Sequence, residues 1–553
     1  MDKLFVIAIG GTGMRCLESF IHLCAIGMFD NQTIDILTLD TDQTNGNKGR
    51  VEILIDLYNR IKSNEENKVD GGHSNTDTFF SAKLRLFRFY TNYSDLTGNS
   101  YKQLTHTSAI DSDEDNDDLS NLFFDEKTVQ QFQLDHGYRA QTHLGSLLMY
   151  HSIVRAALNA QTDKDLASEP EKDLKCFVDE LMRNQNSARV FVFGSIFGGT
   201  GASSIPVIPI ALRDAVKIYT DKKGDLDLKS VKFGSTLLTD YFSFTSPDEG
   251  SKKNEKVIAD STYFAINSQA ALQFYLADPT VKSTYRRFYH IGWPLKKLNV
   301  SNNQKTNTGG KTQENACHMV ELLSACAAYD FFTLSDDKLS NETAKYFFRS
   351  IEESEGKLSL KGSDFISNGP LFENKLGSFF SLAHIILSQC EAAWDKSVKH
   401  GTCELLAFCE GWDDLKGLYN SISEHQAQEM DEYMRYFAYS FDNEKNIVKG
   451  WIYQLKQSID GRFIFNDQAF TEAYSEMKNV SAGHLFIEAQ HNWSEMKGVF
   501  RKTDNSIEEL CKNMRNPQTT QPFIKQNVQT PKEKFLAHIY NAITIKQKFN
   551  LNS

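Results

Sequence analysis

The tetrapeptide Gly-Gly-Thr-Gly occurs twice in this chain of 553 residues, at residues 10–13 and at residues 198–201. Each copy follows an apolar run, LFVIAI or ARVFVFGSIF, and precedes a stretch with helix-like spacing of apolar residues. Glycines let a backbone approach a phosphate closely, and the free N–H groups of a helix's first turn attract the anion. A single such turn can equally be a plain strand–helix corner. Two of them on one sheet predict that both grip one polyphosphate.

Two acidic residues stand at another strand end. Asp40 and Asp42 follow the apolar run TIDILTL. Carboxylates at the carboxyl end of a strand suit a Mg²⁺ ion held beside a nucleotide. The same two side chains are equally suited to capping a turn, so the stretch alone leaves both interpretations open.

The elements that must position these residues alternate between strand and helix in the first half of the chain. The near-continuous apolar run at 188–197 is typical of a strand buried on both faces of a parallel sheet, and residues 229–242 and 286–294 are predicted as further strands. The order predicts an α/β fold with a Rossmann-like parallel sheet and helices on both faces. We expect a nucleotide-binding domain at 1–312, interrupted by a polar surface insertion at about 64–135. A central core helix at 313–335 and a mainly helical α+β part at 336–553 complete the predicted organisation.

The composition narrows the class of protein. The formal net charge of −12 argues against a nucleic-acid partner, and no apolar run is long enough to span a bilayer. Nine scattered cysteines show neither a disulfide framework nor zinc-ligand spacing, which is typical of a reducing cytoplasm. We therefore expect a cytoplasmic protein.

Other nucleotide motifs fit the sequence less well. Gly310-Lys311-Thr312 resembles the end of a Walker loop, but Lys305 stands where that motif needs its first glycine. A dinucleotide fingerprint at the first turn fails because Cys16 occupies the position of its third glycine.

The second turn carries a family resemblance. FGGTGASSIPV, residues 197–207, resembles the GGGTG[ST]G loop of the tubulin/FtsZ superfamily, and the chain looks closest to its divergent bacterial tubulin-like members. It matches at residues 198–201 and at Pro206, and it departs at Phe197, Ala202 and Ser203. The resemblance covers roughly the first 335 residues, apart from the insertion. It implies a GTP-binding domain with a long central helix.

The resemblance also implies roles for individual residues. Asp42 would sit near the Mg²⁺-bound water, with Asp40 close by. Ala140 and Gln141 fall where the family commonly has Gly-Asn facing the γ-phosphate. Asn267 would recognise guanine, and Asn315 would make a second base contact, with Cys317 and His318 as alternatives. The phosphate-binding backbone would come from Gly10, Gly11, Thr12, Gly13, Gly198, Gly199, Thr200 and Gly201.

In this superfamily, acidic residues after the central helix complete GTP hydrolysis in the pocket of a neighbouring subunit. The segment FFTLSDDKLSNET offers Asp336, Asp337 and Glu342 as catalytic candidates, although no motif selects one of them. The same acids are good N-cap residues for a following helix, and this interpretation is equally open.

Three functions follow. The first is a GTP-binding protein of tubulin/FtsZ type that assembles head to tail into a cytoskeletal filament and hydrolyses GTP, with Mg²⁺, at the subunit contact. The second is a non-polymerising nucleotide sensor or scaffold, in a multi-component bacterial system such as phage defence, that binds a protein partner through its C-terminal half. The third is a dinucleotide-dependent enzyme.

Overall fold

The computed structural model describes residues 2–29, 32–62, 78–90, 142–162, 167–242, 261–293, 316–349, 362–384, 386, 422–441, 447–458, 532–533, 535–537 and 540. Ala140, Gln141 and Asn315 lie outside them, as do Gly310-Lys311-Thr312 and most of the predicted insertion.

A seven-stranded sheet, parallel throughout, forms the centre of the molecule, which confirms the predicted α/β class. The strand order is β3-β2-β1-β4-β5-β6-β7. From β1 the chain builds one side of the sheet with β2 and β3, then crosses back to β4 on the other side. The boundary between β1 and β4 is therefore the topological switch point of the sheet, where the loops of neighbouring strands diverge. The strands are β1 (Lys3–Ile9), β2 (Thr33–Asp40), β3 (Lys83–Tyr90), β4 (Ala188–Phe193), β5 (Lys232–Leu238), β6 (Tyr285–Ile291) and β7 (Lys345–Arg349).

Helices cover both faces of the sheet, and each face has its own apolar core. One face carries α1 (Gly10–Ala25), α2 (Gly46–Lys62) and the predicted central helix, α12 (Met319–Thr333). The other carries α6 (Thr142–Thr162), α7 (Glu169–Arg183), α8 (Gly199–Ser204), α9 (Ile208–Tyr219), α10 (Phe264–Ala277) and α11 (Pro279–Thr284). The central strands are apolar on both sides because helices cover them on both sides; every residue of β4 is buried.

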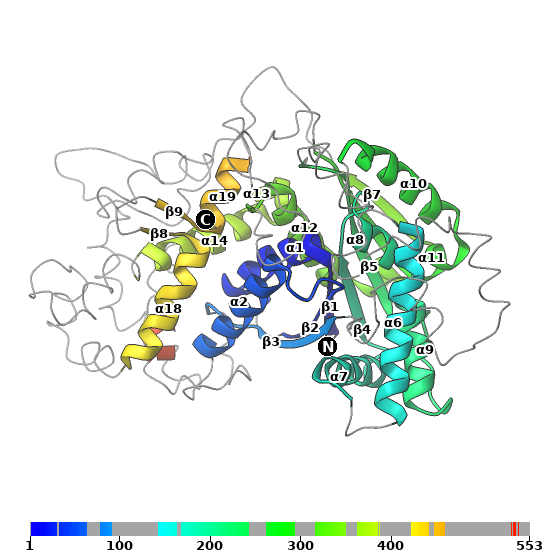
Figure 1. Ribbon diagram of the computed structural model, residues 1–553. Helices are drawn as coiled ribbons and strands as arrows, with labels where there is room; N and C mark the ends of the chain where they lie inside the picture. Colours follow the sequence, from blue (N-terminus) through cyan, green and yellow to red (C-terminus); the bar gives the residue numbers. More distant parts are fainter. Residues whose placement is uncertain are drawn as a thin grey trace, which may run out of the picture.

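C-terminal helices form an additional layer outside α1 and α2 (Figure 1). The indole Nε1 of Trp451 donates a hydrogen bond to the Ser19 hydroxyl of α1 at 2.9 Å, and the His22 ring lies 3.1 Å from the Tyr433 hydroxyl. This layer contains α13 (Gly362–Phe365), α14 (Gly369–His384), α18 (Glu424–Phe437), α19 (Trp451–Ser458) and the hairpin of β8 (Tyr439–Phe441) with β9 (Ile447–Lys449).

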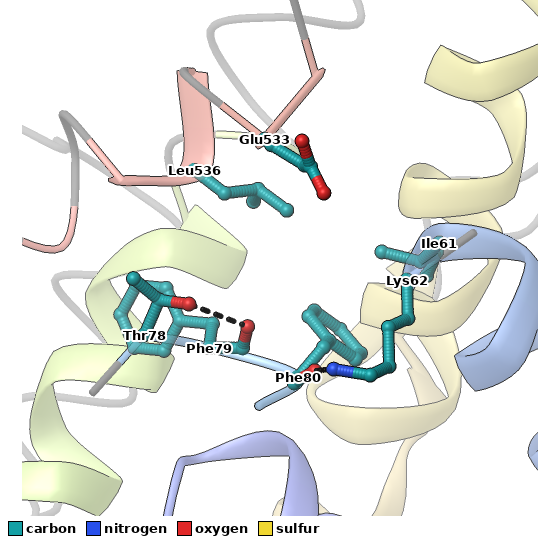
Figure 2. A pocket seen from close by; sticks show the side chains of 7 residues that line it. All are labelled: Ile61, Lys62, Thr78, Phe79, Phe80, Glu533 and Leu536. Carbon is teal, nitrogen blue, oxygen red and sulfur yellow. Dashed lines mark hydrogen bonds between the residues drawn. The ribbon is translucent and has the colours of Figure 1, made fainter. Parts of the chain in front are cut away.

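Residues near the end of the chain lie beside the segment that leads into β3, an edge strand of the sheet. A cavity of about 20 Å³ separates Glu533 and Leu536 from residues 78–80 and the end of α2 (Figure 2). Beside it the buried Lys62 ammonium donates hydrogen bonds to the carbonyl oxygens of Phe80 at 3.0 Å and Ser81 at 2.8 Å. The C-terminal part therefore packs on the first domain at several separate places.

Two strands correct the predicted boundaries. Residues 83–90 lie inside the expected polar insertion, yet they form β3 at one edge of the sheet. The strand looks polar because of its arginines, but the Arg85 side chain forms two hydrogen bonds with the buried Asp35 carboxylate of β2. At the other edge, β7 extends the sheet beyond the expected boundary at 336, and Tyr346 stacks on Phe288 of β6.

Among the described residues, no helix combines the length and the apolar character needed to cross a bilayer.

Candidate functional site

The two Gly-Gly-Thr-Gly turns lie side by side. Because β1 and β4 are neighbours and parallel, both turns emerge at the same end of the sheet, where α1 and α8 begin. A Cβ atom added to Gly10 would lie only 3.2 Å from the Cβ atom of Thr200. The two turns therefore form adjoining walls at the switch point between β1 and β4.

The glycines of these turns have different tasks. Gly10 has a φ of +63°, a conformation that favours glycine. A Cβ atom on Gly13 would lie 2.6 Å from the Phe193 carbonyl oxygen, and one on Gly201 would lie 2.6 Å from the Ser195 carbonyl oxygen. These two glycines let each helix pack closely against the neighbouring backbone. The positions that stay partly exposed to solvent are Gly11, Thr12, Gly198 and Thr200.

Neither helix is capped by the side chain of the residue that precedes it. The N-cap residues are Ile9 for α1 and Gly198 for α8, and neither forms a side-chain capping hydrogen bond. The first amide groups of a helix have no partner within the helix, so they need an external acceptor such as water or an anion. The long helix α1 adds the positive end of its dipole to this position.

Asp40 and Asp42 lie beside the first turn, because β2 pairs with β1 and brings Leu39 next to Ile9. Both are buried. The Asp40 carboxylate accepts hydrogen bonds from the Thr41 amide at 2.8 Å and the Asn45 side chain at 3.1 Å. That of Asp42 accepts from the amide and the hydroxyl of Thr44, both at 3.0 Å. The turn-capping interpretation of the two acids is thus confirmed, and their contact with a metal stays a prediction.

Burial controls the charge of Asp40. It raises the pKa of this carboxyl to about 7, although the amides of Asp42 and Thr41 oppose the shift by donating to the charged form. In the part of the chain that the structure describes, no three His, Cys, Asp or Glu side chains gather to hold a metal ion. A Mg²⁺ ion at this place would therefore rely mainly on phosphate oxygens and water.

Asn267 belongs to the same neighbourhood. It lies on α10, and its Nδ2 atom is 3.5 Å from the carbonyl oxygen of Phe197, the residue just before the second turn. Phe197 itself is buried among the rings of Phe264, Phe242 and Tyr241, with centroid distances of 4.9, 5.4 and 6.0 Å. Its bulk therefore packs into the aromatic core next to the turn.

The acidic candidates after α12 lie at the opposite end of the sheet. Asp336, in the short helix η4 (Asp336–Leu339), accepts a hydrogen bond from Arg189 near the start of β4 at 2.9 Å and another from Lys232 at the start of β5. The Lys232 ammonium holds the pKa of Asp336 below its usual range. Asp337 and Glu342 are exposed. Within one chain, none of these acids adjoins the glycine turns.

A buried ionic network behind the first turn was missed by the sequence analysis. The Arg50 guanidinium donates to Glu18 at 2.9 and 3.1 Å, and Arg15 lies 3.5 Å from Glu321 of α12. The charges of Arg50 and Arg15 outweigh the effect of burial and hold the pKa of Glu18 at about 2. The only sequence signal is that Arg15 and Glu18 interrupt the apolar pattern of α1. Tyr241 completes the network by donating to Glu321 at 2.8 Å.

The two alternatives to Asn315 have structural roles. His318 is buried, and its Nδ1 atom accepts a hydrogen bond from the Val320 amide at 3.2 Å, which caps α12. The amide of Cys317, also buried, donates to the Gln454 side chain at 2.7 Å. Both residues fix the start of the central helix against its surroundings.

No family model, no curated protein and no solved structure matches this chain.

Proposed function

We propose that the two glycine turns bind the phosphates of one nucleoside triphosphate. The observation that carries this proposal is the close approach of Gly10 to Thr200, where an added Cβ atom on Gly10 would lie 3.2 Å from the Thr200 Cβ atom, at the switch point of a parallel sheet. Ligands of open α/β sheets bind in the crevice at such points. The partly exposed backbone of Gly11, Thr12 and Gly198 supports the same conclusion.

We propose GTP as the nucleotide, with Mg²⁺. The preference for guanine rests on the tubulin/FtsZ resemblance of the second turn and on Asn267, whose carboxamide can pair with the guanine edge. The position of Asn267 beside Phe197 supports this role. Asp42 would hold the metal through a water molecule, with Asp40 next to it, and the ion would neutralise phosphate charge. The raised pKa of Asp40 means that binding a cation there would release a proton near neutral pH.

Head-to-tail assembly is the arrangement that would complete a GTPase. The glycine turns lie at the carboxyl ends of the strands, and Asp336 lies at their amino ends. Stacking copies along the strand direction would bring the acids of one copy towards the nucleotide of the next. Because Asp336 is already held by Arg189 and Lys232, the exposed Asp337 and Glu342 are better placed to orient an attacking water.

A non-polymerising sensor is the second candidate function. It is favoured by the packing of the C-terminal helices directly on α1, where Trp451 bonds to Ser19 and Tyr433 lies beside His22. A change at the start of α1 would then reach a partner-binding surface on these helices. Light scattering and electron microscopy with GTP separate the two functions, since nucleotide-dependent filaments would exclude the sensor.

Binding of GTP, ATP and NAD by the full chain tests the proposal. We expect GTP to bind most tightly in the presence of Mg²⁺. Thr200→Ala is expected to weaken GTP binding with or without the metal, and Asp42→Asn only when Mg²⁺ is present. Asp225→Asn, at an exposed position paired with Lys217, is the control and leaves affinity unchanged. Tight binding of NAD without GTP binding would favour a dinucleotide enzyme instead.

A further inference from the structure

A cavity of about 350 Å³ lies between the edge strands β6 and β7 of the sheet, the central helix α12 and the short helix α13. Small-molecule sites in proteins have volumes of about 300 to 1,000 Å³, and their walls are mostly apolar and aromatic with a few polar groups. Neither glycine turn lines this cavity, so it is separate from the proposed nucleotide site.

The alternation of side chains along the strands decides which of them face the cavity. The rings of Tyr289 on β6 and Phe347 on β7 stack with their centroids 5.8 Å apart. The Tyr289 hydroxyl donates to the carboxylate of Asp330 on α12 at 2.7 Å, which places both rings on the face that α12 covers. Successive side chains of a strand point to opposite faces. His290 and Phe348, whose rings are 5.0 Å apart, therefore lie on the other face and contribute main chain to the cavity.

The wall opposite the sheet is held in place by its own contacts. Phe365 of α13 is buried, and its ring lies 5.2 Å from that of Phe372 on α14. The amide of Gly362 donates to the Glu373 side chain at 2.6 Å, and a Cβ atom on Gly362 would overlap the carbonyl oxygen of Gly369. Because these contacts form without a ligand, a ligand does not have to order this wall when it binds.

The charge of the cavity is negative. Asp330 is the only Asp, Glu, Lys or Arg among the residues that line it, and this side chain is 41% exposed. Both neighbours of the carboxylate, the Tyr289 hydroxyl and the Arg287 guanidinium at 3.9 Å, approach the same oxygen, Oδ2. The other oxygen, Oδ1, can therefore accept hydrogen bonds from a ligand. An anionic ligand would meet this carboxylate without a cation among the lining residues.

Aromatic rings beside a carboxylate are the surroundings that bind an organic cation. The ring of Phe347 already has a cation next to it, because the Arg287 guanidinium lies 4.4 Å from its centroid. The remaining walls are apolar, with Leu323 and Ala327 on α12 and Ile366 after α13.

We propose that this cavity binds a small organic cation, a primary ammonium group attached to a flat apolar body. The ammonium group donates to Asp330, and the apolar body fills the space between Phe347 and Phe365. This proposal does not depend on nucleotide binding, since it concerns a different face of the sheet and a different set of residues.

Isothermal titration calorimetry of the full chain without nucleotide tests the proposal. The probes are tryptamine and two analogues of the same shape, tryptophol with a hydroxyl and indolepropionate with a carboxylate in place of the ammonium group. For a ligand of this size we expect tryptamine to bind with a dissociation constant of about 1 mM or lower. Tryptophol should bind about tenfold more weakly, because hydrogen bonds between charged partners are stronger. Indolepropionate should not bind. Absence of tryptamine binding, or equal binding of tryptamine and tryptophol, would overturn the proposal.

Variants separate the roles of charge and shape. Asp330→Asn is expected to remove the preference for tryptamine over tryptophol, whereas Asp225→Asn, at an exposed position away from the cavity, keeps it. Phe347→Ala should weaken the binding of both probes. Its matched control is Phe348→Ala, because that side chain lies on the opposite face of the same strand. Ala327→Leu fills the cavity and should abolish binding. Thermal melts verify that each variant is folded, and a preference that survives in Asp330→Asn would contradict the assigned role of its charge.

Discussion

Replacing Gly10 by Ala tests whether the two glycine turns truly adjoin. The substitution acts in two ways, since Gly10 has a φ of +63° and its new Cβ would lie 3.2 Å from the Cβ atom of Thr200. Gly27 offers a matched control. It also has a positive φ, of +87°, but it follows the far end of α1, away from both turns.

The expected magnitudes follow from these two effects. A left-handed backbone conformation costs a residue with a side chain about 1 to 2 kcal/mol, and this cost applies to both alanine variants. Crowding against a neighbour that must shift by a few tenths of an ångström adds about 1 kcal/mol for Gly10→Ala. We therefore expect Gly10→Ala to lower the free energy of unfolding by about 2 to 3 kcal/mol. It also pushes the turns apart, so GTP affinity falls in Gly10→Ala and stays unchanged in Gly27→Ala.

Urea unfolding and equilibrium nucleotide binding measure the two consequences, and a double mutant isolates the contact. Because Thr200→Gly removes the atoms that the new methyl group meets, its cost and that of Gly10→Ala should not add. We expect a coupling of about 1 kcal/mol between them, whereas independent sites add to within about 0.5 kcal/mol. Additive costs, together with an unchanged affinity in Gly10→Ala, would refute the idea that the turns form one site.

Three further predictions concern neighbouring residues. Phe197→Ala removes a ring buried among three aromatic side chains, so it should lower the free energy of unfolding by about 3 to 5 kcal/mol in a urea titration; a stable variant with altered GTP affinity would instead make Phe197 a wall of the ligand site. Asp40 has a pKa of about 7 when folded against 3.8 when exposed, so the folded state binds more protons in this window and stability falls as pH rises from about 4 to 7. Asp40→Asn should flatten that part of the stability–pH curve, and an unaltered curve would contradict the assigned burial effect. Asp336→Asn should leave GTP affinity unchanged, because Asp336 lies at the other end of the sheet. It should lower the free energy of unfolding by less than about 1 kcal/mol, because the side chain is 65% exposed. Weakened GTP binding would show that this end of the sheet is coupled to the glycine turns.

The sequence alone predicted the parts of the fold that rest on local pattern. Apolar runs before each glycine turn predicted β1 and β4, and their parallel pairing follows from the alternation of strands and helices. The sequence of β3 resembles a polar surface insertion because it contains charged residues such as Arg85. The hydrogen bonds of Arg85 with Asp35 form only when β2 lies alongside β3. β7 is short, and only its pairing with β6 reveals it as part of the sheet.

The residues of the site also fall into those that the sequence pattern predicts and those that only the fold brings together. Gly10 and Thr200 could be chosen from the sequence because the same short motif occurs after two strands. Arg15, Glu18 and Glu321 could not, because their significance comes from contacts between α1 and α12, which are about 300 residues apart in the chain. Local periodicity carries no information about which charged side chains will meet in the core.

Hydrogen exchange with and without Mg²⁺ and a non-hydrolysable GTP analogue measures the central claim most directly. If the two turns bind one triphosphate, the amides of Gly11 and Thr12 and those of Gly199 and Thr200 gain protection together, at the same analogue concentration. Protection of one turn without the other, or of neither, would contradict a single site built from both.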